Sequence, residues 1–285
     1  MRFYRPTSPA VRQMTGIEYR KFITEKKPVK ALTIKLKSRG GRNSKGRITV
    51  RHQGGGAKRS YRMIDFKQSS FGEPAKVEAI EYDPYRTAFI ARVVYMSGAR
   101  NYVIAPQGLN VGDTITASNT VIDLKTGNRL PLRDFPLGSF VYNVELKPGQ
   151  GGKLARSAGT SIKVMAKEGN FISLQMPSGE VRKVLDMCLA SLGSVSNPEK
   201  KMVVIGKAGR ARHMGTRPTV RGSAMNPVDH PYGGGEGRQM RGLKRPKNAW
   251  GKGTRGVKTR RRKARSNVFI IQRRSCLSKN AVKIS

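Results

Sequence analysis

One segment of the chain, residues 206–238, sets an acid beside a base: Asp229 is followed directly by His230, and the segment has neither a strand nor a helix period. A carboxylate and an imidazole held together could act as a general acid–base pair. The sequence supplies no nucleophile beside them, and a lone histidine more often forms a hydrogen bond or stacks on a ring. We therefore expect no catalytic residue in this chain, and a hydrolase built on Asp229 and His230 is the weaker alternative.

The residues also argue against a nucleotide loop, a disulfide scaffold and a metal site. At Gly152-Lys153, the nearest approach to a P-loop, Leu154 stands where a hydroxyl residue is needed and Lys147 stands where glycine is needed. Two cysteines are too few for a stapled scaffold or a four-cysteine zinc site. Cys188 lies in an apolar run, which predicts a core thiol, and Cys276 has no histidine nearby. We expect no metal and no cofactor held by the chain itself.

Glycine and basic residues recur together at both ends of the chain, in residues 38–62, 206–238 and 241–279. Glycine lets the backbone approach a phosphate closely, and the arginine fork binds phosphate oxygens through two hydrogen bonds. A flexible basic linker is the plain alternative, but the recurrence favours contact with nucleic acid. The basic residues expected at such contacts are Arg42, Arg47, Arg51, Lys58, Arg59, Arg62, Arg210, Arg212, Arg217, Arg221, Arg238, Arg260, Arg261 and Arg262.

Two features near the C-terminus allow two interpretations each. The run Arg260–Lys263 is also typical of a nuclear-localisation signal, which would leave the rest of the segment unexplained. Trp250 could stack on a base or cap a local cluster.

No apolar stretch approaches the roughly 20 residues of a membrane span, and the N-terminus lacks a signal-peptide core. We therefore expect no membrane contact and a cytoplasmic location.

Positive charge is concentrated at the two ends of the chain. The 285 residues include 57 Lys and Arg against 17 Asp and Glu, a formal net charge of +40. Residues 1–60 contribute +15, residues 61–205 contribute +5 and residues 206–285 contribute +20. The ends have too little apolar surface to offset the entropy of ordering, so we expect them to need a polyanion such as a phosphate backbone. The centre is expected to fold by itself.

The centre alternates apolar and polar residues with a period of two. Runs rich in Val, Ile, Tyr and Phe, separated by Gly and Pro turns, predict strands; they read AKVEAIEYD, AFIARVVYM, RNYVIAP, DTITA, SFVYNVEL, SIKVMA, FISLQM, EVRKVL and MVVIG. Helix is expected to be scarce. The stretch AGTSIKVMA (158–166) could form a short helix, but its alternation favours a strand. Such spacing predicts a mostly β chain built from small antiparallel barrels.

The turn-rich, apolar-poor segment 126–138 is the expected boundary between two barrels. We expect four parts: a basic Gly-rich extension (1–59), an OB-like RNA-binding barrel (60–125), an SH3-like barrel (126–200) and a basic extension (201–285).

Longer blocks of sequence resemble one known family. NPVDHPYGGGEGR (226–238), preceded by GKAGRARHMGTRPTVRGSAM, closely resembles the C-terminal signature of the ribosomal protein L2 family, in its bacterial form. GGRNSKGRITVRHQGGGAKRSYRMIDF (40–66), IEYDPYRTAFIA (80–91), YVIAP (102–106) and ELKPGQGGKLARSAGTS (145–161) are similar to its other blocks. One position departs: Tyr232 stands where many members have a second histidine, which weakens the transfer of any histidine-pair chemistry.

The resemblance implies an OB-like barrel joined to an SH3-like barrel, with basic arms threaded into large-subunit ribosomal RNA. By match to its motifs, Arg86, Arg156, Lys67 and the basic residues of 58–62 would contact this rRNA. Asp229 and His230 would lie in the arm that approaches the peptidyl-transferase region, with His230 at the RNA.

The implied function is that of a structural constituent of the large ribosomal subunit, supporting assembly, subunit association, tRNA binding and organisation of the peptidyl-transferase region. Catalysis in that particle is by RNA, and Mg ions would reach the chain only through the rRNA. The implied partners are neighbouring ribosomal proteins, the small subunit at an intersubunit bridge and nearby tRNA, without homo-oligomers. A free-standing nucleic-acid chaperone is the rival class, because it would share the basic ends but not the family's blocks.

Overall fold

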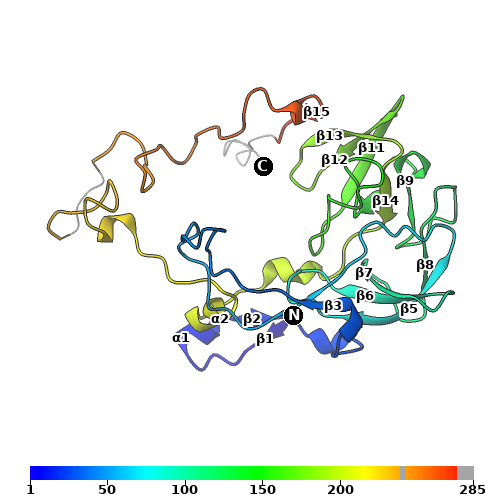
Figure 1. Ribbon diagram of the computed structural model, residues 1–285, viewed down its shortest axis with the longest axis horizontal. Helices are drawn as coiled ribbons and strands as arrows, with labels where there is room; N and C mark the ends of the chain where they lie inside the picture. Colours follow the sequence, from blue (N-terminus) through cyan, green and yellow to red (C-terminus); the bar gives the residue numbers. More distant parts are fainter. Residues whose placement is uncertain (238–241, 275–285) are drawn as a thin grey trace, which may run out of the picture. The chain divides into compact units, whose positions relative to one another are not determined.

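The computed structural model describes residues 1–237 and 242–274 and divides the chain into two compact units (Figure 1). The barrel unit comprises residues 1–37, 58–207 and 266–285, and the glycine–arginine unit comprises residues 38–57 and 208–265. The mostly β class predicted from the period-two pattern is confirmed, and the sheets are consistent with an OB-like barrel followed by an SH3-like barrel.

The first barrel is built on a four-stranded antiparallel sheet with the order β7-β6-β5-β8. Alternation along β5 buries Ala75, Val77 and Ala79 and exposes Lys76 and Glu78, as a half-buried strand requires. The inward side chains form one apolar cluster. The strands are β5 (Pro74–Glu81), β6 (Ile90–Tyr95), β7 (Arg100–Ile104) and β8 (Thr114–Thr116).

The second barrel is built on a seven-stranded sheet with the order β15-β13-β12-β11-β10-β14-β9 (Figure 1). Its core includes Leu130, Phe135, Ile162 and Leu174, each 0% exposed. A smaller cluster of Ile104, Tyr142 and other residues connects it to the first barrel. The strands are β9 (Arg129–Pro131), β10 (Phe140–Tyr142), β11 (Ile162–Glu168), β12 (Phe171–Gln175), β13 (Val181–Leu185), β14 (Leu189–Leu192) and β15 (Ile270–Gln272).

Residues 1–37 pack on the first barrel. Ile17 is buried in the barrel's apolar cluster, and the backbone N–H of Val29 donates to Tyr102 Oη at 3.0 Å. Arg92 binds three carboxylates, those of Glu25, Glu78 and Glu81. The elements of this part are β1 (Arg2–Phe3), α1 (Pro9–Arg12), β2 (Thr15–Gly16) and β3 (Thr33–Lys35), the last of which pairs with β4 (Ser60–Arg62).

The glycine–arginine unit has no buried side chain among its described residues. Its one regular helix there is α2 (Ala208–His213). Backbone hydrogen bonds join its two segments: Gly54 N donates to Gly215 O at 2.8 Å, Ala57 N to His213 O at 2.9 Å and Arg217 N to His52 O at 3.0 Å. This unit is therefore held by backbone contacts and turns instead of an apolar core.

Two expectations from the sequence need correction. Segment 126–138 is not an apolar-poor boundary, because Leu130, Leu132 and Phe135 are fully buried and β9 lies within it. MVVIG is no strand: Val204 exchanges hydrogen bonds with Thr15 without a regular ladder. Parts of the two basic ends belong to the barrel unit, because β15 extends the second sheet and residues 1–37 contact the first barrel. Of the stretch 158–166, residues 162–166 lie in strand β11, as its alternation predicted, and no part of it is helical.

Candidate nucleic-acid interface

Three arginines stack on three aromatic rings in the barrel unit. Arg59 Cζ lies 4.5 Å from the Tyr85 ring centroid, and Arg156 Cζ lies 4.6 Å from that of Phe66. Arg86 Cζ lies 5.1 Å from the Tyr61 ring and 5.4 Å from the Phe66 ring. Stacking fixes the plane of a guanidinium and leaves its N–H edge for phosphate. We name this group the arginine–aromatic cluster; its members are Arg59, Tyr61, Phe66, Tyr85, Arg86 and Arg156.

Asp83 positions one side of the cluster. Its carboxylate is fully buried, accepts the backbone N–H of Tyr85 at 2.8 Å and pairs with the Arg86 guanidinium. Arg86 also donates to Tyr61 Oη at 3.0 Å. The DPYR sequence thus forms a turn closed by its own aspartate, and this turn holds Tyr85 and Arg86 at the cluster.

The loop 147–153 positions the other side. Glu145 is 0% exposed, and its carboxylate accepts the N–H groups of Gly149 at 3.1 Å and Gly151 at 2.9 Å, as well as Leu189 N at 3.3 Å. It also pairs with buried Arg129 at 3.1 Å. Burial lowers the pKa of the Arg129 guanidinium, which the adjacent carboxylate opposes.

The same loop then contacts the backbone of Phe66, a member of the cluster. Gly152 N donates to Phe66 O at 3.0 Å, and a Cβ on Gly152 would lie 1.9 Å from Asn143 Oδ1, so only glycine fits there. The chain leaves this contact toward Arg156, which stacks on Phe66. The cluster is therefore assembled from both barrels.

The predicted RNA-contact residues in the barrel unit differ in where the structure places them. Arg59, Arg86 and Arg156 come together in the cluster, while Lys58 and Lys67 are exposed in the segments next to it. Arg86 is less available than predicted, because its side chain is 15% exposed and neutralises Asp83.

Arg62 does not fit the prediction of an RNA contact. It is 8% exposed, and its Nη1 donates to Ser60 O at 2.9 Å. A side chain as buried as this one, at the end of β4, does not present its fork to an external phosphate, so the assignment of Arg62 is corrected to a structural role.

The predicted arginines of the glycine–arginine unit lie on turns or on a short helix. Arg42, Arg47 and Arg51 are exposed around a turn in which Asn43 Oδ1 accepts the N–H groups of Lys45 and Arg47, each at 3.0 Å. The residues Arg217, Arg221, Arg260, Arg261 and Arg262 are exposed, Arg210 and Arg212 of α2 are half-buried, and Arg238 lies outside the described residues.

His230 lies on a cavity of about 320 Å³ within this unit, lined also by Arg221, Lys247 and Arg255. Its Nδ1 accepts the backbone N–H of Tyr232 at 3.1 Å, which leaves the proton of the neutral ring on Nε2. A Cβ on Gly222 would lie 2.6 Å from the ring, so the backbone closes over the imidazole. Asp229 is exposed. The cavity places three cations around an oriented imidazole, which suits an anionic ligand.

The sequence reasoning missed the residues that hold the cluster together. The aromatic partners Tyr61, Phe66 and Tyr85 alternate with arginines in KRSYRMIDF and DPYR, and this interleaving was the available signal. Asp83 could be inferred from the Asp-Pro turn. Glu145 and Arg129 carried no local signal, because their pairing joins β9 to the segment after β10, 16 residues apart along the chain.

Within residues 1–237 and 242–274 there is no group of three His, Cys, Asp or Glu side chains that could hold a metal ion. In the same part of the chain, no helix is long and apolar enough to cross a membrane.

Two family models match the chain. Residues 29–117 match the RNA-binding N-terminal domain of ribosomal proteins L2, and residues 125–251 match the C-terminal domain of the same proteins. The first match contains Arg59, Arg86 and their aromatic partners, and the second contains Arg156 and His230. The two matches are consecutive and span most of the sequence. With an interface of stacked arginines on two small barrels, the chain belongs to the ribosomal protein L2 family, structural RNA-binding proteins of the large ribosomal subunit.

Proposed function

We propose that this chain docks on large-subunit rRNA through the arginine–aromatic cluster, while the glycine–arginine unit lies along rRNA phosphates. The single observation that carries the proposal is the stacking of Arg59, Arg86 and Arg156 on rings of the first barrel, with Arg156 reaching them from the second barrel. RNA helices hide the base edges of their major groove, so recognition would rest on phosphates, 2′-hydroxyls and shape. Fixed guanidinium forks suit such a surface.

The glycine–arginine unit supports the second half of the proposal by its composition. It carries 22 Lys and Arg against 2 Asp and Glu in 78 residues, a net charge of +20. Its turns leave Arg42, Arg47 and Arg51 exposed, and its described residues form no apolar core. Neutralising phosphates with these cations would release condensed counterions and make binding steeply salt-dependent.

Finer roles follow from the family and form part of the proposal. The chain would support assembly of the large subunit, subunit association through a bridge to the small subunit, tRNA binding and organisation of the peptidyl-transferase region, beside neighbouring ribosomal proteins. His230 would support that region by contacting RNA through its cavity, and RNA would perform the catalysis. Mg²⁺ would reach the chain through rRNA phosphates.

The docking test uses the two cluster arginines that do not neutralise a buried acid. Arg59→Ala and Arg156→Ala should each weaken binding of in vitro transcribed large-subunit rRNA by about 5- to 30-fold and lower the salt slope by about one. Filter binding across a salt series measures both quantities. Arg133→Ala, an exposed arginine outside the cluster, is the matched control. Affinities equal to wild type for both cluster variants would overturn the docking proposal.

A further inference from the structure

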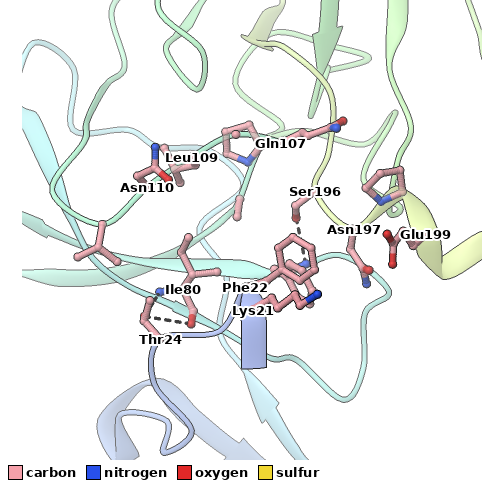
Figure 2. A pocket seen from close by; sticks show the side chains of 16 residues that line it. Lys21, Phe22, Thr24, Ile80, Gln107, Leu109, Asn110, Ser196, Asn197 and Glu199 are labelled. Atoms are coloured by element: carbon pink, nitrogen blue, oxygen red, sulfur yellow. Dashed lines mark hydrogen bonds between the residues drawn. The ribbon is translucent and has the colours of Figure 1, made fainter. Parts of the chain in front are cut away.

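The barrel unit contains a pocket that is separate from the arginine–aromatic cluster. It has a volume of about 370 Å³ and lies between the segment around Phe22, the loop 105–111 and residues 196–199. Figure 2 shows Phe22 between Leu109 and Asn110 on one side and Asn197 and Glu199 on the other. None of the residues expected to contact RNA lines it.

We propose that this pocket takes one unpaired nucleobase of an RNA, stacked on Phe22. The proposal rests on the RNA-binding function proposed above and adds a base-binding subsite to it. Unpaired bases are the parts of an RNA that enter protein pockets, because they can swing out of the helix and stack on aromatic side chains.

Phe22 provides the stacking surface. Its ring stacks on Phe89, with centroids 5.7 Å apart and planes inclined by 29°. Phe89 is buried at 3% exposure, whereas Phe22 is 46% exposed. A ring fixed from behind by a second ring and open in front is the geometry that binds a base without reorganisation.

The walls of the pocket fit a flat polar ring better than an aliphatic side chain. Its volume falls in the usual range for small-ligand sites, about 300–1,000 Å³. The pocket is lined by the amide side chains of Gln107 and Asn110 and by the apolar side chains of Ile80 and Leu109 (Figure 2). The amide of Asn197 also lines it, with its Nδ2 already donating to Thr87 O at 2.7 Å. Gln107 Oε1 already accepts Ser194 Oγ at 3.1 Å, which leaves its N–H donors for a ligand. Amides match the mixed donors and acceptors of base edges.

Charge distinguishes a nucleotide from an apolar peptide as the occupant. The two charged groups on the pocket wall are paired: Lys21 with Glu18 at 2.7 Å, and Glu199 with the N-terminal ammonium at 3.1 Å. The segment around Phe22 nevertheless carries an exposed set of cations, Arg20, Lys21, Lys26 and Lys27. A neutral base inside and its phosphates outside would satisfy both features.

The test measures binding of the full chain to in vitro transcribed large-subunit rRNA. Phe22→Leu keeps apolar volume but removes the ring face, so it should weaken binding by about 5- to 150-fold. Phe22→Trp keeps a face and should bind within about threefold of wild type. Because stacking releases no counterions, the salt slope of Phe22→Leu should equal that of wild type, whereas Arg156→Ala lowers it. UV cross-linking with peptide mapping should join a nucleotide to the peptide that contains Phe22.

Phe140→Leu is the matched control, since Phe140 is 54% exposed on strand β10 and lies outside the pocket. Thermal unfolding checks that each variant folds. If wild type binds rRNA, but Phe22→Leu binds as well and no nucleotide is joined to the Phe22 peptide, the pocket does not hold a base and the subsite is overturned; a protein side chain would then be the better occupant. If wild type fails to bind rRNA at all, the proposed function itself is overturned.

Discussion

The two units present positive charge to RNA in opposite ways. Each carries a formal net charge of +20, but the barrel unit spreads it over 207 residues and the glycine–arginine unit over 78. Every buried apolar side chain among the described residues belongs to the barrel unit. The barrel unit can therefore hold its arginines in place with rings and buried carboxylates, whereas the described residues of the other unit are shaped by turns and hydrogen bonds without an apolar core.

The two kinds of contact differ in the origin of their binding free energy. A guanidinium stacked between fixed rings loses little entropy when it binds, so a few such groups can set the register of docking. An exposed arginine on a glycine turn contributes through charge and counterion release, so many are needed. Preorganisation and charge density are thus divided between the two units.

The largest effect is expected from the buried ion pair of the barrel unit. Glu145→Ala would leave Arg129 charged and fully buried and would free the N–H groups of Gly149 and Gly151. Breaking such a pair costs about 3–5 kcal/mol. Urea unfolding at pH 7 should show this loss, with rRNA affinity falling as well because the loop no longer carries Arg156 to Phe66.

Glu168→Ala is the control for Glu145→Ala, since the pair of Glu168 with Lys183 is exposed and should contribute less than about 1 kcal/mol. Equal unfolding free energies for Glu145→Ala and wild type would show that the barrel unit does not depend on this network, and the comparison between the units would fail.

The next effect concerns charge alone. Replacing four exposed arginines of the glycine–arginine unit by glutamine should reduce rRNA affinity on the order of 10²- to 10³-fold at 0.1 M salt and lower the salt slope by about three. Melting temperature should not change, because none of the four is buried. The set is Arg42, Arg47, Arg51 and Arg217.

A variant of equal charge separates position from net charge. Its four substitutions remove exposed cations of the barrel unit outside the cluster: Lys76, Lys125, Arg133 and Lys167. If both quadruple variants lose affinity equally, charge acts without regard to place, and the division of roles between the units is wrong.

The sequence predicted the parts of this design that local pattern encodes. Period-two alternation predicted β5–β8 and β10–β13 but not β9, β14 or β15. The coincidence of glycine with arginine predicted the glycine–arginine unit. Burial of β9 was missed because Arg129, Asn128 and Pro131 read as turn and surface residues, although Arg129 is buried against Glu145. Arg62 was assigned to RNA for the same reason: charge alone does not show whether a side chain points inward.

The smallest of the three effects tests how the barrel unit anchors its N-terminal segment. Tyr102 is fully buried; its hydroxyl donates to Glu81 Oε2 at 2.8 Å and accepts Val29 N. Tyr102→Phe removes both bonds and should cost about 1–3 kcal/mol at pH 7. Burial raises the pKa of Tyr102 to about 12, above the value near 10 of an unfolded chain. Between these values the unfolded chain loses the proton while the folded chain keeps it, so the stabilisation falls as pH rises. Urea unfolding from pH 7 to 11.5 should show the gap between wild type and Tyr102→Phe narrowing above pH 10. A gap that stays constant would mean that the hydroxyl does not secure this segment, and residues 1–37 would then resemble the glycine–arginine unit more than the barrels.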